Sequence, residues 1–116
     1  MDPSADIAAV KAYADAHGVA LELEQEGNTL YLISIARKNG KAGAGRAVME
    51  KICELADAWQ WETCLAVKGS EPKLIFYYQQ FGFNHGMMDD EWAEFITDFQ
   101  NDEYYGDEVQ MWRDPR

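Results

Sequence analysis

The feature that most limits how this chain can fold is a two-residue turn signal, Gly27-Asn28, between two stretches of strand-like sequence. Before the turn, leucine alternates with glutamate over residues 20–26, which is the period-2 pattern of a strand with one acidic face. After the turn, residues 29–36 (TLYLISIA) are apolar on both faces, as in a central strand. Residues 20–36 are therefore predicted to form a hairpin that leads into a buried strand.

Further helices and strands are predicted on both sides of this hairpin. One helix precedes it, opened by Asp2-Pro3-Ser4 and stopped by Gly18. An amphipathic helix is predicted after residues 37–45, with Val48, Ile52, Leu55 and Trp59 on one face. Residues 62–67 and 109–113 are predicted strands. A third helix begins after Pro72, and a short amphipathic helix covers residues 90–99. This order predicts a single domain over residues 1–116, an α/β fold with a mixed sheet covered by helices.

Charge and composition narrow the classes of function. Asp and Glu number 21 against 10 Lys and Arg, giving a formal net charge of −11, which argues against nucleic acid or an anionic membrane as partner. No apolar run reaches about 18 residues, and the first ten residues lack the features of a signal peptide. Cys53 and Cys64 have no CxxC spacing, and no zinc ligand set is visible. We therefore expect a cytoplasmic protein without a metal.

A basic, glycine-rich loop separates the predicted buried strand from the second helix. Its glycines let backbone N–H groups at a helix start approach an anion. It matches neither the GxxxxGK[ST] string of a Walker A loop nor the dinucleotide-binding GxGxxG with its later acidic residue. Taken alone, it is either a phosphate-binding loop or a flexible loop that caps a helix. Four of the chain's ten basic residues lie in it: Arg37, Lys38, Lys41 and Arg46.

Taken in order, these motifs resemble the Gcn5-related N-acetyltransferase superfamily. In that family a strand leads into a [Q/R]-x-x-G-x-[G/A] loop and a helix that hold the pyrophosphate of acetyl-CoA. A later helix carries a tyrosine four residues before a Gly-Phe pair. Residues 43–45 (GAG) match the first motif, and Tyr78 with residues 82–83 (GF) matches the second. Residues 111–115 (MWRDP) resemble the family's last strand, so the resemblance covers roughly residues 20–115.

Three features depart from the family pattern. Gly40 stands where the family has Gln or Arg, three residues before Gly43, although Arg37 offers an alternative R-x-x-G-x-A register ending at Ala42. Only one helix is visible before the hairpin, where the family normally has a strand and two helices. An acidic stretch over residues 90–108 is inserted before the last strand.

The resemblance implies an acetyl-CoA-dependent N-acetyltransferase that passes the acetyl group directly to an amine. It implies that backbone N–H groups of the strand before the loop orient the thioester, and that Tyr78 protonates the departing thiolate. The alternative for Tyr78 is a packing role in an aromatic helix. The sequence does not identify the base. Glu22 and Glu24 share one strand face and are candidates, although alternating acids of this kind are more often a solvated sheet face. The residues expected to contact acetyl-CoA are Ile33, Ile35, Lys38, Lys41, Ala42, Gly43, Ala44, Gly45, Arg46 and Tyr78.

The acidic C-terminal part of the sequence does not identify the amine that accepts the acetyl group. Residues 75–111 hold nine carboxylates and no Lys or Arg. They form either a solvated surface or a field that attracts a cationic acceptor such as a polyamine, a lysine side chain or an aminoglycoside. Aromatic residues at helical spacing within 92–99 predict packing on the core or on a second subunit, as in a homodimer. The alternative to an enzyme is a non-enzymatic module of the same fold that binds acyl-CoA or a partner protein.

Overall fold

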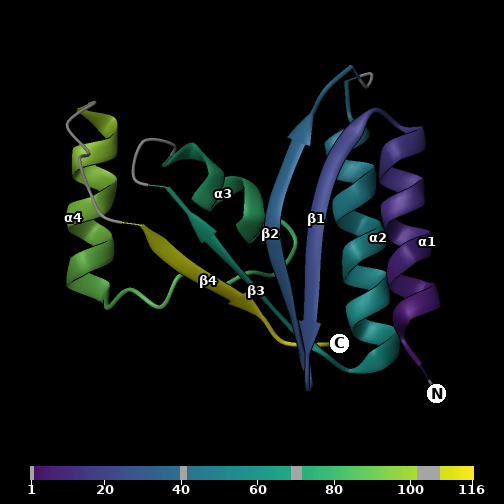
Figure 1. Cartoon of the computed structure of the whole chain (residues 1–116). Coiled ribbons are helices and arrows are strands. Elements are labelled where there is room, and N and C mark those ends of the chain that lie inside the picture. The colour runs from purple at the N-terminus through teal and green to yellow at the C-terminus, as the bar shows by residue number, and fades with distance from the viewer. Residues whose placement is uncertain (1, 40–41, 69–71, 102–107) are drawn as a thin grey trace. The chain divides into compact units, whose positions relative to one another are not determined.

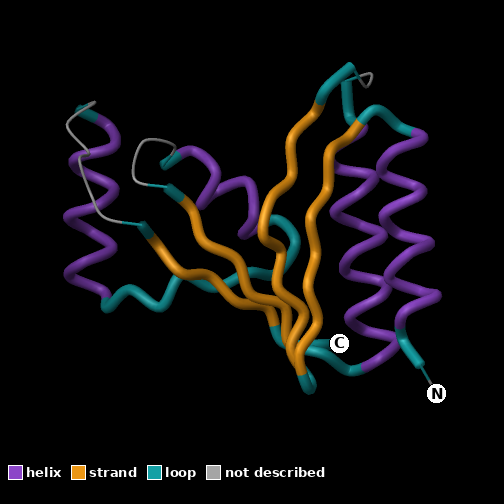
Figure 2. The backbone as a smooth tube through the Cα atoms, viewed as in Figure 1, coloured by secondary structure: helices purple, strands orange, loops and turns teal. Residues whose placement is uncertain are grey.

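The computed structural model describes residues 2–39, 42–68, 72–101 and 108–116. Its strands, orange in Figure 2, form one sheet of four strands in the order β1-β2-β3-β4. In this sheet β2 pairs antiparallel with β1 and parallel with β3. The mixed α/β fold class predicted from the sequence is confirmed. The elements in chain order (Figure 1) are α1 (Ser4–Ala16), β1 (Val19–Glu26), β2 (Thr29–Arg37), α2 (Ala44–Trp59), β3 (Glu62–Val67), α3 (Lys73–Gln79), α4 (Asp89–Gln100) and β4 (Val109–Arg113).

The chain divides into two compact units. The first consists of Met1–Cys64 with Asp114–Arg116, and the second of Leu65–Arg113. The boundary falls inside β3, so this strand contributes residues to both. The single domain over residues 1–116 stays a prediction.

In the first unit, α1 and α2 lie side by side on one face of the β1–β2 hairpin (Figure 1). Gly27, at a φ of 59°, makes the two-residue turn that the sequence predicts. The helical and strand periodicities place apolar side chains on the shared face, where their burial stabilises the unit. The buried residues include Val10, Ala14, Val19, Leu23, Leu30, Leu32, Val48, Met49 and Ile52.

The second strand of the hairpin is less buried than its sequence predicts. Leu30 and Leu32 are buried, but the side chains of Tyr31 and Ile33 are 38% and 50% exposed. In this unit the helices cover one face of the hairpin and leave the other open. β2 is central in the order of the strands, yet the expectation that both of its faces are buried is wrong.

In the second unit, α3 and α4 meet through aromatic rings. The ring of Phe76 on α3 lies 5.8 Å from Trp92, 5.8 Å from Phe95 and 5.1 Å from Phe99 on α4, measured between ring centroids. The aromatic residues of α4 therefore pack on a helix of the same chain. This contact confirms the first of the two packing partners considered for them.

Residues that follow α3 reach β4 through backbone contacts. Asn84 and Trp112 form an isolated antiparallel bridge, so the segment beginning at Phe83 is extended but is not a regular strand. Arg113 is buried, with 4% of the residue exposed. Its Nε donates a hydrogen bond to the carbonyl oxygen of Phe81 at 2.7 Å. A buried charge is tolerated where it is hydrogen-bonded in this way.

Gly86 lies against the ring of Trp112 in this unit and gives a test of that contact. It has a φ of 70°, and a Cβ added there would lie 2.7 Å and 2.9 Å from two carbons of the Trp112 ring. We expect Gly86→Ala to lower the free energy of unfolding by about 1–3 kcal/mol, from left-handed strain and displacement of the indole. Chemical denaturation measures the loss. Gly27→Ala is the matched control, because Gly27 has a φ of 59° and no atom within 4 Å of an added Cβ. An equal loss in both variants would contradict the contact with Trp112.

Candidate functional site

The N-terminus of α2 has no side-chain cap within the described part of the chain. Gly43, at a φ of 90°, is the residue before the helix, and it provides no side-chain cap. The first turn of α2 also holds no acidic residue. The first N–H groups of a helix have no acceptor within the helix, and the helix dipole makes this end positive. An anion at this end would therefore find donors that the protein's own side chains do not cap.

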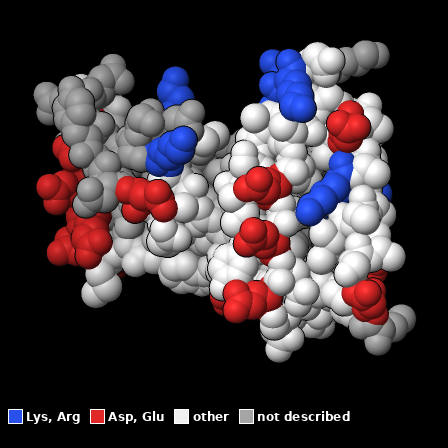
Figure 3. Space-filling model, viewed as in Figure 1, with Lys and Arg blue, Asp and Glu red and all other residues white. Residues whose placement is uncertain are grey.

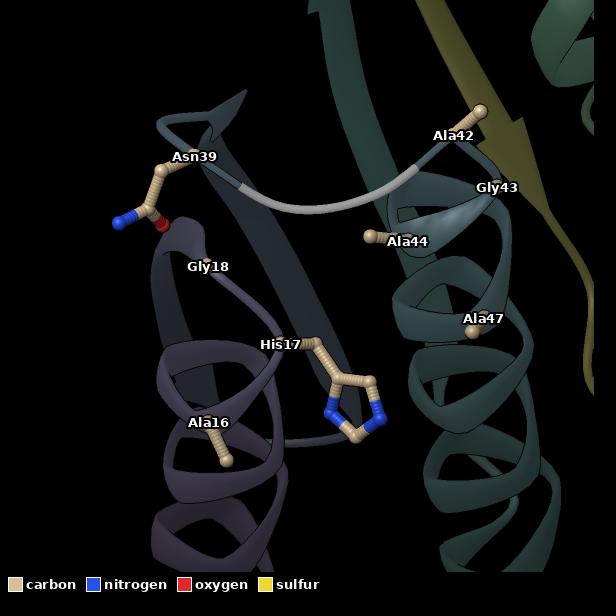
Figure 4. A pocket seen from close by; sticks show the side chains of 8 residues that line it. All are labelled: Ala16, His17, Gly18, Asn39, Ala42, Gly43, Ala44 and Ala47. Carbon is tan, nitrogen blue, oxygen red and sulfur yellow. The ribbon is translucent and has the colours of Figure 1, made fainter.

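A pocket of about 560 Å³ opens at this end of α2 (Figure 4). Two backbone hydrogen bonds hold its walls together: the carbonyl of Gly18 accepts from the N–H groups of Lys38 at 2.8 Å and Asn39 at 3.3 Å. They tie the end of α1 to the residues that follow β2. The lining residues come from these two segments and from the start of α2: Ala16, His17, Gly18, Asn39, Ala42, Gly43, Ala44 and Ala47.

The pocket brings together three of the residues predicted to contact acetyl-CoA, Ala42, Gly43 and Ala44. Gly45 and Arg46 follow them in the first turn of α2, and the Arg46 side chain is exposed. Gly40 and Lys41, the other loop residues singled out in the sequence, lie outside the described residues.

Charge is distributed unevenly over the first unit. Arg37 and Lys38 are exposed at the end of β2, next to the pocket-lining Asn39. In Figure 3 basic side chains gather at this end of the hairpin, whereas acidic side chains follow the strands toward the opposite end. An anion is therefore favoured at the pocket end of the unit.

His17 is a residue of the pocket that the sequence analysis missed. Its Nδ1 lies 2.8 Å from the carbonyl oxygen of Tyr13, and its ring stacks on the Tyr13 ring at 4.1 Å between centroids. The only local signal was its place before Gly18, which stops α1 with a φ of 71°. Nothing in the sequence around His17 indicates that it faces the start of α2, which lies more than twenty residues away.

The backbone of β2 is irregular where the sequence predicts that it orients a thioester. Leu23 pairs with Leu32 and Glu22 with Ser34, so Ile33 is the extra residue of a β-bulge. Pairing with β3 covers only Thr29–Tyr31, whereas pairing with β1 continues to Arg37. Among the described strands, none pairs with the other edge of β2 from residue 32 onward. Backbone groups on that edge therefore have no ladder partner in a described strand, which the predicted contacts of Ile33 and Ile35 require.

Glu22 and Glu24, the candidate bases, are both exposed on β1. Glu22 lies opposite Ser34, one residue beyond the bulge, and Glu24 lies opposite the half-exposed Tyr31. The structure places both on the hairpin beside β2. Their role as base remains a prediction, because the same exposure suits a solvated sheet face.

Tyr78 belongs to α3 in the second unit. Its side chain is 7% exposed, and its ring packs edge-on against Tyr77 at 5.3 Å and Phe83 at 5.9 Å. The aromatic packing considered for this helix is present. Its catalytic role remains a prediction.

The surroundings of two other potentially reactive side chains, Cys64 and His85, shift their pKa values. Burial, together with a hydrogen bond from the Cys64 thiol to the Glu62 carboxylate at 3.5 Å, raises the pKa of the thiol to about 11. His85 stacks on Trp92 at 4.1 Å with an angle of 6° between ring planes, and its burial lowers the pKa of the imidazole. The Cys64 thiol is therefore not a ready nucleophile at neutral pH, since a thiol reacts as its thiolate.

Within the described ranges, no three His, Cys, Asp or Glu side chains converge as a metal site requires. No helix in that part of the chain is both long and apolar enough to cross a bilayer.

Solved structures share this architecture. Ard1 from Thermoplasma volcanium superposes with a TM-score of 0.61 over 95% of this chain and 78% of its own, at 13% sequence identity. The fold is that of the Gcn5-related N-acetyltransferases. Naa50 from Arabidopsis thaliana, solved with the bisubstrate analogue CoA-Ac-MVNAL, shares this fold with a TM-score of 0.53 at 14% identity. It matches over 82% of this chain and 62% of its own length.

Naa20 from Chaetomium thermophilum, also solved with a bisubstrate analogue, matches with a TM-score of 0.51 at 15% identity. The match covers 84% of this chain and 58% of Naa20. The chain thus spans less than two thirds of the Naa50 and Naa20 chains. No protein-family model matches the sequence, and a search of the curated proteins finds no match. At these identities the likeness to Gcn5-related N-acetyltransferases is one of fold.

Proposed function

We propose that this protein binds acetyl-CoA, with the pyrophosphate at the start of α2. The observation that carries this proposal is the pocket at an uncapped, glycine-led helix N-terminus. Two phosphates are strong acceptors, and backbone N–H groups at the positive end of a helix are their usual partners. The fold supports the choice of ligand, because the CoA-containing analogue in Naa50 is held by a protein of the same fold.

The proposed reaction transfers the acetyl group from the thioester to an amine. The neutral amine attacks the thioester carbonyl, its C–N bond forms, and the C–S bond breaks as the thiolate leaves with a proton. Backbone N–H groups of β2 near Ile33 and Ile35 polarise the carbonyl, which is the kind of stabilisation that an oxyanion needs. Tyr78 supplies the proton to sulfur, and Glu22 or Glu24 accepts the proton of the amine.

The proposed acceptor is a primary amine carried by a peptide or a small cation. The peptide portion of the Naa50 analogue supports a peptide amine. The exposed carboxylates of the first turn of α4, Asp89, Asp90 and Glu91, support a cationic acceptor, since they lower the potential at the protein surface. A non-enzymatic module of this fold would bind acetyl-CoA but leave every amine unmodified.

Thermal unfolding with acetyl-CoA, CoA and ATP tests the ligand. At a ligand concentration 100 times the Kd, binding adds about 2.7 kcal/mol to the free energy of unfolding, enough for a clear rise in Tm. Acetyl-CoA and CoA should raise the Tm and ATP should raise it less. Mass spectrometry of a peptide and amine panel then tests the transfer. A rise in Tm without any acetylated product would establish the binding module, and no rise with any CoA compound would overturn the proposal.

A further inference from the structure

The pocket at the start of α2 has one ionisable side chain among its described lining residues, the imidazole of His17. Figure 4 shows the ring at the end of α1, turned toward α2 and across from Ala47. Ala47 lies one helical turn beyond Gly43, to whose carbonyl its N–H donates at 3.1 Å. The imidazole therefore lines the pocket one turn away from the backbone donors that would hold the pyrophosphate.

The hydrogen bond to Tyr13 determines which ring nitrogen can serve a ligand. The carbonyl oxygen of Tyr13 only accepts, so Nδ1, at 2.8 Å from it, carries a hydrogen. Stacking on the Tyr13 ring holds the plane of the imidazole. Nε2 is left for the pocket: it accepts when the ring is neutral and donates when the ring is protonated.

Charged groups approach His17 from three elements. From α2, the Nζ of Lys51 lies 5.3 Å from the ring centroid of Tyr13, and it is ion-paired with Glu54 at 3.5 Å. After the end of β2, the backbone N–H of Lys38 donates a hydrogen bond to the carbonyl of Gly18, the residue after His17. On α1 itself, Asp15 lies two residues away, a spacing that does not place side chains face to face on a helix. Among the described lining residues no carboxylate occurs, so an anion there meets no negative side chain.

We propose that His17 determines affinity for the nucleotide half of CoA, by donating a hydrogen bond from protonated Nε2 to a phosphate group. This inference rests on the proposed function, because it assumes that CoA occupies the pocket. CoA offers two phosphate groups of this chemistry, the pyrophosphate and the 3′-phosphate. A phosphate anion favours the protonated form of a neighbouring imidazole, so binding takes up a proton and the affinity rises as the pH falls.

Calorimetry of CoA binding at pH 6 and pH 8 tests the inference. Because a phosphate stabilises the protonated imidazole, the wild-type affinity at pH 6 relative to pH 8 should exceed the same ratio for His17→Gln. The variant keeps a polar side chain but cannot gain charge. In buffers of different ionisation enthalpy at pH 7, the wild type should take up more protons than the variant when CoA binds. Titration of a CoA phosphate that His17 does not contact is common to both proteins and cancels in the comparison.

Two further variants separate charge at this position from other effects. His17→Lys carries a permanent charge, so its affinity at pH 8 should exceed that of His17→Gln and should lack the added pH dependence. His85→Gln removes the other histidine of the chain, which stacks on Trp92, and should keep the wild-type pH dependence. Circular dichroism confirms that each variant is folded.

The 3′-dephospho form of CoA identifies the phosphate. Loss of the wild-type pH dependence with this ligand assigns the contact to the 3′-phosphate, and its retention assigns the contact to the pyrophosphate. Equal pH dependence and equal proton uptake in wild type and His17→Gln would overturn the inference while leaving acetyl-CoA binding intact. Absence of CoA binding to the wild type would instead overturn the proposed function.

Discussion

Replacing Gly43 with glutamate should abolish the rise in Tm that acetyl-CoA produces, while the protein remains folded. A Cβ at Gly43 would meet no atom of the described residues within 4 Å, so the first carbon of a side chain causes no clash with them. The new carboxylate would lie beside the helix amides that hold the pyrophosphate, where it competes for the same donors and repels the ligand. We expect the Kd of acetyl-CoA to rise by a factor on the order of 10² or more, since a charge-assisted contact is replaced by repulsion.

The backbone of Gly43 requires a matched control for this variant. Its φ of 90° is unfavourable for any residue with a side chain, and the strain lowers stability by about 1–3 kcal/mol whichever residue is introduced. Gly43→Gln has the same shape and the same strain without the charge. The two variants should therefore unfold at similar temperatures, with acetyl-CoA affinity reduced much more in Gly43→Glu. Equal, near wild-type affinity in both would show that the pyrophosphate does not bind at this helix start.

Features that depend on local sequence could be predicted closely. The turn at Gly27-Asn28 and the glycine before α2 need backbone conformations that few other residues adopt, so their positions are visible in the sequence. The fourth helix, predicted over residues 90–99, spans Asp89–Gln100, because its aromatic residues repeat at helical spacing.

Features that depend on tertiary contacts could not be predicted in this way. The exposure of Tyr31 and Ile33 follows from helices covering one face of the hairpin, which a count of apolar residues in β2 cannot reveal. No glycine or proline stands at the bulge at Ile33, so the sequence does not indicate its position. His17 enters the pocket only because α1 packs beside α2, so the sequence analysis identified Ala42, Gly43 and Ala44 but not the histidine that lines the same pocket.

Tyr78→Phe should lower the rate of acetyl transfer by roughly 10²-fold, within the usual range for loss of a general acid. A tyrosine hydroxyl titrates near 10 and is protonated at neutral pH, so it can donate to a leaving thiolate whose thiol has an ordinary pKa of about 8.5. Phenylalanine keeps the ring and therefore the edge-on packing against Tyr77 and Phe83. The affinity for acetyl-CoA should change little, because the lost group acts in the transition state rather than in binding.

The neighbouring Tyr77 gives the control that separates chemistry from packing. It lies on the same helix, is partly buried and packs edge-on against Phe81, so Tyr77→Phe also removes one hydroxyl from the aromatic cluster. Each substitution should cost no more than about 1.5 kcal/mol of stability, the net worth of one hydrogen bond. Only Tyr78→Phe should lower kcat, and the loss should persist with every amine acceptor, because proton donation to sulfur does not depend on the acceptor. If both variants lose stability equally and keep wild-type kcat, Tyr78 is a packing residue and another group protonates the thiolate.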